Sequence, residues 1–112
     1  MEPERGSVTA EFAAALPAVV LLLGMALAAF AVGSQAVRLQ DAAGLAARAM
    51  ARGESPSGVS ALVSALVPGA RIERRDGPGL VCAAVTARAD GLLAGIELRA
   101  GSCALPESAG TR

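Results

Sequence analysis

The chain has no histidine, lysine, tryptophan or tyrosine, and only two phenylalanines among its 112 residues. The lack of histidine excludes an imidazole base, a histidine metal ligand and a Ser-His-Asp triad, and the lack of lysine excludes Schiff-base chemistry. Ten arginines balance ten carboxylates to a net charge of zero. A nucleic-acid binder needs a basic face and stacking rings, so we expect no nucleic-acid partner.

Other reactive groups are also few. The two cysteines form neither a Cys-x-x-Cys pair nor a zinc-binding pattern. Ser57, Ser60 and Thr86 carry hydroxyls, but no base, metal cluster or phosphate loop accompanies them. We therefore expect no enzyme activity, cofactor, metal site or small-molecule substrate.

A long apolar run dominates the N-terminal half. From Phe12 to Val37 no residue is charged, and Phe12 to Gly33 has no polar face. About 20 apolar helical residues cross a bilayer core of about 30 Å, and Pro17 and Gly24 are tolerated in such a helix. A cleaved secretory signal is the alternative, but its apolar region is shorter and follows positive charge. We predict a transmembrane helix over about 12–34.

The helix is predicted to continue beyond the membrane. Residues 38–52 include many strong helix formers and no proline. At 100° per residue these positions separate into two faces of a helix. The charged face contains Arg38, Asp41, Arg48 and Arg52. The apolar face contains Leu39, Ala43, Ala46 and Met50. We expect one helix over 7–53, with an amphipathic extension over 35–53 and Gly53 as its stop. Two helices with a bend near Gly33 are the alternative.

The distal region, 54–105, is predicted to contain a short helix and a small sheet. Ser55-Pro56 is typical of a helix start, and Pro68-Gly69 of its end. Three strand-like segments follow at 70–76, 80–89 and 95–105, separated by turn-like sequences. The helix would have an apolar stripe of Val59, Leu62, Val63, Leu66 and Val67. The fold class is α+β, with a disordered tail at 106–112.

The strand register can be tested by arithmetic. Placing Cys82 opposite Cys103 also places Thr86 opposite Arg99 and pairs the charges of Arg88 and Glu97. This register separates two faces, a polar one with Cys82, Thr86, Arg88, Glu97, Arg99 and Cys103, and an apolar one with Val81, Ala83, Val85, Ala87, Ile96, Leu98 and Ala100. Folding the first strand back around Gly77-Pro78 puts Ile72 opposite Ala83. We expect an antiparallel meander whose apolar face packs on the amphipathic helix.

The opposed cysteines predict a disulfide. It would close a loop of about 22 residues and contribute about 3 kcal/mol in the chain-entropy model. Two free thiols in a cytosolic domain are the alternative. A disulfide implies an extracytoplasmic domain, whereas the arginine count, with Arg5 before the span and Arg38, Arg48 and Arg52 after it, favours the opposite orientation.

The N-terminal motif bears on this conflict. Six leader residues end in Gly6, and Glu11-Phe12 follows directly before the apolar run. This pattern resembles the class III signal of type IV pilin-like proteins. The segments RGSVTAEFA and VRLQDAAGLAARAMARG, within residues 5–53, are similar to TadE-like minor pilins of tight-adherence (Tad/Flp) pilus systems.

The resemblance implies a function and an orientation. A prepilin peptidase would cut between Gly6 and Ser7 on the cytoplasmic side, and Glu11, with Phe12 beside it, would guide assembly as the fifth mature residue. The domain would lie outside, in agreement with the cysteines. Implied partners are that peptidase, other pilins, the Tad membrane platform and the lipid bilayer, in an apparatus for adhesion or secretion.

Two alternatives stay open. Glu11 could pair with the new Ser7 amine of a neighbouring subunit, because an unpaired carboxylate at the edge of the hydrocarbon is costly. Instead, Thr9 could cap the helix and place Glu11 in a first turn favoured by the helix dipole. For the whole chain, the alternative to a minor pilin is an uncleaved single-pass scaffold of a secretion or envelope complex.

Overall fold

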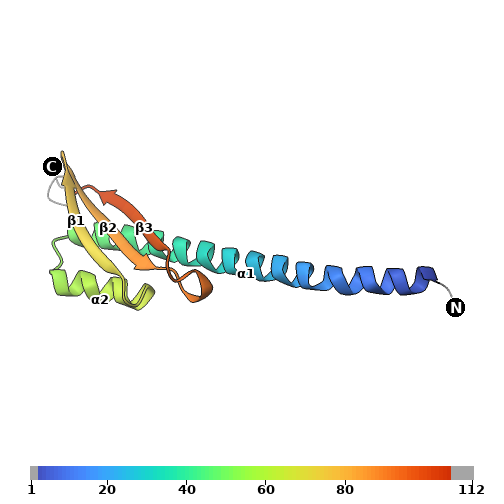
Figure 1. The fold of residues 1–112 in the computed structure, drawn as a ribbon. Helices are drawn as coiled ribbons and strands as arrows, with labels where there is room; N and C mark the ends of the chain where they lie inside the picture. Colours follow the sequence, from blue (N-terminus) through green and yellow to red (C-terminus); the bar gives the residue numbers. More distant parts are fainter. Residues whose placement is uncertain (1–2, 107–112) are drawn as a thin grey trace.

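The computed structural model describes residues 3–106, which form an elongated molecule of 87 × 24 × 17 Å. One long helix forms the shaft, and a small α+β domain packs on its C-terminal half (Figure 1). The elements in chain order are α1 (Pro3–Ala51), α2 (Pro56–Leu66), β1 (Arg71–Gly77), β2 (Leu80–Arg88), the single 3-10 turn η1 (Gly91–Leu93) and β3 (Glu97–Ala104). The predicted α+β fold class is confirmed.

The helix α1 is continuous. Pro17 lies inside it, and the helix passes through Gly33, so the alternative with two helices is wrong. It begins at Pro3, several residues before the expected start, and therefore includes the end of the leader.

The C-terminal end of α1 is a Schellman motif. Gly53 takes a positive φ of 83°, and its N–H donates to the carbonyl of Met50 at 3.0 Å, while the N–H of Glu54 donates to Ala49 at 3.1 Å. Only glycine adopts this conformation at little cost, which explains why the helix stops here. The predicted stop at Gly53 is confirmed.

The second helix has the predicted start and packing face. The Ser55 hydroxyl accepts from the N–H of Gly58 at 3.2 Å, and Pro56 occupies the first turn. Val59, Val63 and Val67 are buried. The predicted apolar stripe is confirmed, and it packs on the same core as α1.

The sheet has the order β1-β2-β3 with both pairs antiparallel. Between β2 and β3 the predicted register is confirmed, with Cys82 opposite Cys103, Thr86 opposite Arg99 and Arg88 opposite Glu97. Among the described residues, Arg88 and Glu97 are opposed in the register but form no ion pair. The Glu97 carboxylate instead lies 3.7 Å from Arg71.

The register of β1 differs from the prediction by two residues. Ile72 lies opposite Val85 rather than Ala83, because the turn needs two central residues, Pro78 and Gly79. Proline at the first and glycine with a φ of 68° at the second suit a type II turn, and Gly77 then pairs with Leu80. A shift of two preserves the face, so Ile72 still packs on the core.

The core lies where the sheet and α2 meet the C-terminal half of α1. Leu39, Ala43 and Ala46 are almost wholly buried and Met50 is half-buried, which confirms the predicted apolar face of the helix. The charged face is also confirmed, because its four members, Arg38, Asp41, Arg48 and Arg52, are all exposed. Ile96, expected on the apolar face, is 46% exposed and precedes β3.

The predicted disordered tail falls mostly on residues 107–112, which lie outside the described part of the chain.

Candidate functional site

The predicted cleavage point lies in the second turn of α1. Gly6 and Ser7 are both helical and exposed. A Cβ built on Gly6 meets no atom within 4 Å, and its φ is not positive. The fold of the single chain therefore does not require glycine at position 6.

Glu11 and Phe12 lie on the exposed surface of the same helix, and Phe12 keeps 67% of its surface exposed. Ser7 and Glu11 are four residues apart, which is about one turn and about 6 Å of rise, so they share a face. Because α1 begins at Pro3, Thr9 does not cap it and Glu11 lies beyond its first turn. The capping interpretation of Thr9 is wrong for this form of the chain.

Within residues 3–106, no other element covers the apolar run of α1. The most apolar 18-residue window of α1 is 0% buried, and α1 is long and apolar enough to span a membrane. Large side chains along the segment expose about half to three quarters of their surface, namely Val8, Phe12, Leu16, Val19, Val20, Leu21, Leu22, Leu23, Met25, Leu27, Phe30 and Val37. An apolar surface of this extent marks contact with lipid or with other protein.

Two glutamines, Gln35 and Gln40, lie where the exposed apolar half of α1 meets the half that packs on the folded domain. We call the pair of hydrogen bonds made by Gln35 the Gln35 clamp. The Gln35 amide nitrogen donates to the carbonyl of Arg88 at 2.7 Å, and its oxygen accepts from the N–H of Asp90 at 3.0 Å. Five residues further along, Gln40 donates to the carbonyl of Gly101 at 3.0 Å. These two side chains fix α1 against the end of β2 and against β3. No periodic pattern in the sequence identifies them.

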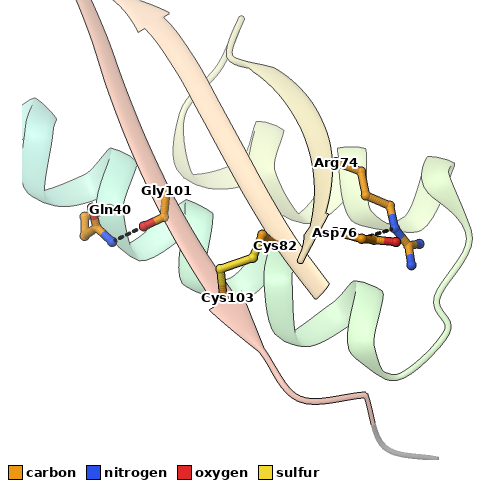
Figure 2. The surroundings of a disulfide bond; sticks show 6 residues. All are labelled: Gln40, Arg74, Asp76, Cys82, Gly101 and Cys103. Carbon is orange, nitrogen blue, oxygen red and sulfur yellow. Dashed lines mark hydrogen bonds and ion pairs between the residues drawn. A yellow bond between two sulfur atoms is a disulfide. The ribbon is translucent and has the colours of Figure 1, made fainter. Parts of the chain in front are cut away.

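The disulfide joins β2 and β3 on the face of the sheet turned away from α1 (Figure 2). Cys82 and Cys103 are direct partners in the register, with their Cα atoms 4.0 Å apart, which corresponds to the closer type of opposed pair in an antiparallel ladder. It lies in the packed half of the molecule, far along the chain from Gly6 and Glu11.

The outer face of the sheet also carries ion pairs. Glu73 accepts from the Nε of Arg75 and lies 3.7 Å from Arg99. The hydrogen bond and the charge of Arg75, with a further contribution from Arg99, hold the pKa of Glu73 below its usual value of 4.5. These groups are exposed, so the pairs are weak and mainly orient side chains on the surface.

No catalytic or metal-binding arrangement is evident within residues 3–106. Ser57 and Ser60 are exposed on α2, and Thr86 lies on β2 next to the ion pairs, so the three hydroxyls do not converge. In this described range, no group of three histidine, cysteine or acidic side chains is arranged to hold a metal ion.

Comparison of the chain with protein-family models finds no match, and comparisons with curated proteins and with solved structures also find none.

Proposed function

We propose that the chain is a minor pilin or pseudopilin of a Tad/Flp-type pilus, processed by a prepilin peptidase between Gly6 and Ser7. The observation that carries this proposal is the position of the motif. Gly6, Glu11 and Phe12 lie at the start of one uninterrupted helix whose apolar part is uncovered, while the folded domain packs only on its other half. A filament subunit needs this division, because its bare helix must pack against other subunits.

The residue at position 6 supports recognition by another protein. Glycine inside a helix costs about 1 kcal/mol relative to alanine. Gly6, like Gly24 and Gly33, has space around it for a side chain and an ordinary helical φ, so the fold does not explain that cost at any of the three. Gly6 differs from the other two in lying directly before the predicted cut. A peptidase that accepts only the smallest residue before the cut would explain it.

Glu11 supports a role in assembly. Cleavage would create a cationic amine on Ser7, about 6 Å from Glu11 along the helix axis. A neighbouring subunit displaced by that rise would bring its own amine to this carboxylate, and the attraction is strong where water is excluded. A pair within one chain competes, since residues at i and i+4 also meet.

The remaining parts of the proposal follow from the same division. The leader lies in the cytoplasm and the disulfide-bonded domain outside, because disulfides persist in oxidising compartments. The subunit is stored in the cytoplasmic membrane as a single-pass protein and passes into a cell-surface pilus. Its partners are the peptidase, other pilins and the Tad membrane platform, and it performs no catalysis.

Processing is tested by the intact mass of the protein extracted from membranes that contain a prepilin peptidase. Loss of the first six of 112 residues leaves 106 beginning with Ser7. Gly6→Leu should abolish this shortening, whereas Gly24→Leu, at a site with equal space inside α1, should not. An intact Met1 start, or a start beyond Phe30, would contradict the proposal.

Assembly is tested separately by Glu11→Ala. The variant should still be shortened but should be lost from sheared surface filaments, because the register-setting carboxylate is gone. Glu54→Ala, at an exposed carboxylate in the folded half, is the matched control. Normal incorporation of the Glu11 variant would refute the pairing.

A single-pass scaffold that is never cleaved is the second candidate. It is favoured by the helical conformation of Gly6 and Ser7, because proteolysis prefers exposed flexible segments. The same intact-mass measurement separates the two functions.

A further inference from the structure

Two segments of the folded domain lie at its end nearest the bare half of α1. They are residues 67–70, between α2 and β1, and residues 89–96, between β2 and β3. Figure 1 shows the second segment, which contains η1, beside α1 and at the end of the sheet that faces the apolar run. The Gln35 clamp holds its beginning, through the carbonyl of Arg88 and the N–H of Asp90.

The segment between β2 and β3 is apolar at its tip. Residues 91–96 read Gly-Leu-Leu-Ala-Gly-Ile and carry no charge. Ile96, at the end of this segment, is 46% exposed. One exposed isoleucine is common on a protein surface. An uncharged loop with an exposed apolar side chain nevertheless suits a membrane interface, where such side chains enter the headgroup boundary.

Three arginines surround a cavity at the same end of the domain. Arg38 from α1, Arg71 from β1 and Arg88 from β2 line a space of about 530 Å³, together with Asp90 and Glu97. Glu97 already lies 3.7 Å from Arg71. With Arg71 next to Glu97, the lining still has Arg38 and Arg88 against Asp90, which leaves an excess of one positive charge and favours an anion such as a phosphate diester.

The end of the domain nearest the apolar run lies, along the axis of α1, where the surface of the bilayer is expected. About 30 Å of hydrocarbon measured from Phe12 at 1.5 Å per residue ends near Val32. Val32 is half-buried, whereas most of the run is exposed, and η1 contacts α1. Gln35 and Arg38 would then lie among the lipid headgroups, with the apolar loop directly beside them.

We propose that residues 89–96 and the cavity of Arg38, Arg71 and Arg88 form a membrane seat, which docks the folded domain on a phospholipid surface. The loop enters the interface with Ile96, and the guanidinium groups bind lipid phosphate. The membrane seat holds the folded domain in one orientation on the bilayer surface before any assembly. This inference rests on α1 spanning the membrane, as in the proposed function, but not on cleavage or pilus incorporation.

The test uses the full chain in lipid nanodiscs at one chain per disc. Ile96→Cys, Ser57→Cys and Leu22→Cys each add one thiol for an environment-sensitive dye, because the native pair is engaged in the disulfide. Quenching by acrylamide, an uncharged quencher that anionic lipid does not repel, should be weaker at position 96 than at position 57 by roughly threefold or more, as expected for an interfacial residue. Position 22 reports whether the helix spans the bilayer.

Lipid charge tests the arginine cavity. Phosphatidylglycerol discs should protect position 96 more than phosphatidylcholine discs, by roughly twofold to fivefold. The double variant Arg38→Gln/Arg88→Gln should remove that difference, whereas Arg74→Gln/Arg75→Gln, on β1 outside this cavity, should leave it unchanged.

Each outcome decides between the proposals. Equal quenching at positions 96 and 57, with position 22 protected, overturns the seat and leaves the membrane span intact. Quenching at position 22 itself overturns the span on which both proposals depend. Protection of position 96 only in discs that hold two chains shows that a second copy, rather than lipid, covers the loop and also overturns the seat.

Discussion

The two halves of α1 have opposite surroundings. Both are rich in alanine, yet Leu22 in the first half is 66% exposed and Leu39 in the second is 1% exposed. In the second half the alanines face the sheet and α2, and their small side chains allow close approach of the backbones. In the first half larger side chains point outward with no element to meet them. A high alanine content therefore does not decide which half of α1 is buried. The buried half is the one that the sheet and α2 cover.

The largest expected effect compares these two leucines. Leu39→Ala removes a buried side chain from the core and should lower the free energy of unfolding of the domain by about 2–5 kcal/mol. Leu22→Ala should leave it nearly unchanged. The chain has no tryptophan or tyrosine, so pulse proteolysis with trypsin in urea, performed in detergent, is a suitable measurement. Equal effects of the two substitutions would contradict the division of α1.

The next effect concerns the disulfide of the packed half. Replacing both Cys82 and Cys103 with serine should cost about 3 kcal/mol, because the loop is no longer closed in the unfolded chain. Reduction of the unaltered protein should lower the urea midpoint in the same proteolysis assay. Before reduction both thiols should resist labelling. Prompt labelling before reduction would show that the bond is not formed. A midpoint that reduction leaves unchanged would show that the bond does not stabilise the domain.

A smaller effect is expected at the boundary between the halves. Gln35→Leu loses a donated and an accepted hydrogen bond, and should cost about 1–2 kcal/mol. Gln40→Leu, which loses one bond, is the matched comparison. Hydrogen exchange at residues 88–96 would locate the change, and an effect of Gln40→Leu larger than that of Gln35→Leu would refute the clamp.

The smallest effect is a dependence on pH in the outer face of the sheet. The folded pKa of Glu73 is lowered below 4.5, mainly by Arg75, so its contribution to stability is present above that pH and is lost as the pH falls through the folded pKa. Glu73→Gln should therefore differ slightly from the native protein at pH 7 and not at the acid end. Urea midpoints between pH 7 and pH 3 would measure this, and a difference that grows in acid would contradict it.

Much of the fold could be predicted because two periodicities were unambiguous. The 3.6-residue pattern from Leu39 to Met50 identified the packed face of α1, and alternation around Cys82 and Cys103 fixed the register of β2 and β3. The sequence places the turn one residue early, at Gly77-Pro78 instead of Pro78-Gly79, which shifts the register by two residues; alternation is preserved by that shift and therefore did not reveal it.

The polar contacts could not be predicted in the same way. Gln35 and Gln40 bind backbone groups more than fifty residues away, and such pairs leave no local pattern. The early start of α1 was missed because the leader contains proline and glycine, although Pro3 suits a first helical turn. The roles of Gly6 and Glu11 depend on other proteins, so they remain predictions based on sequence.

The most direct test of the proposed function is mass spectrometry of surface filaments after shearing and digestion with trypsin. The chain has no lysine, and its first arginines are Arg5 and Arg38. A processed subunit yields a peptide that begins at Ser7 and ends at Arg38, and trypsin alone cannot produce that start, because it would cut after Arg5. The account predicts the Ser7 peptide in the filament fraction. A peptide that begins at Gly6, confined to the membrane fraction, would contradict it.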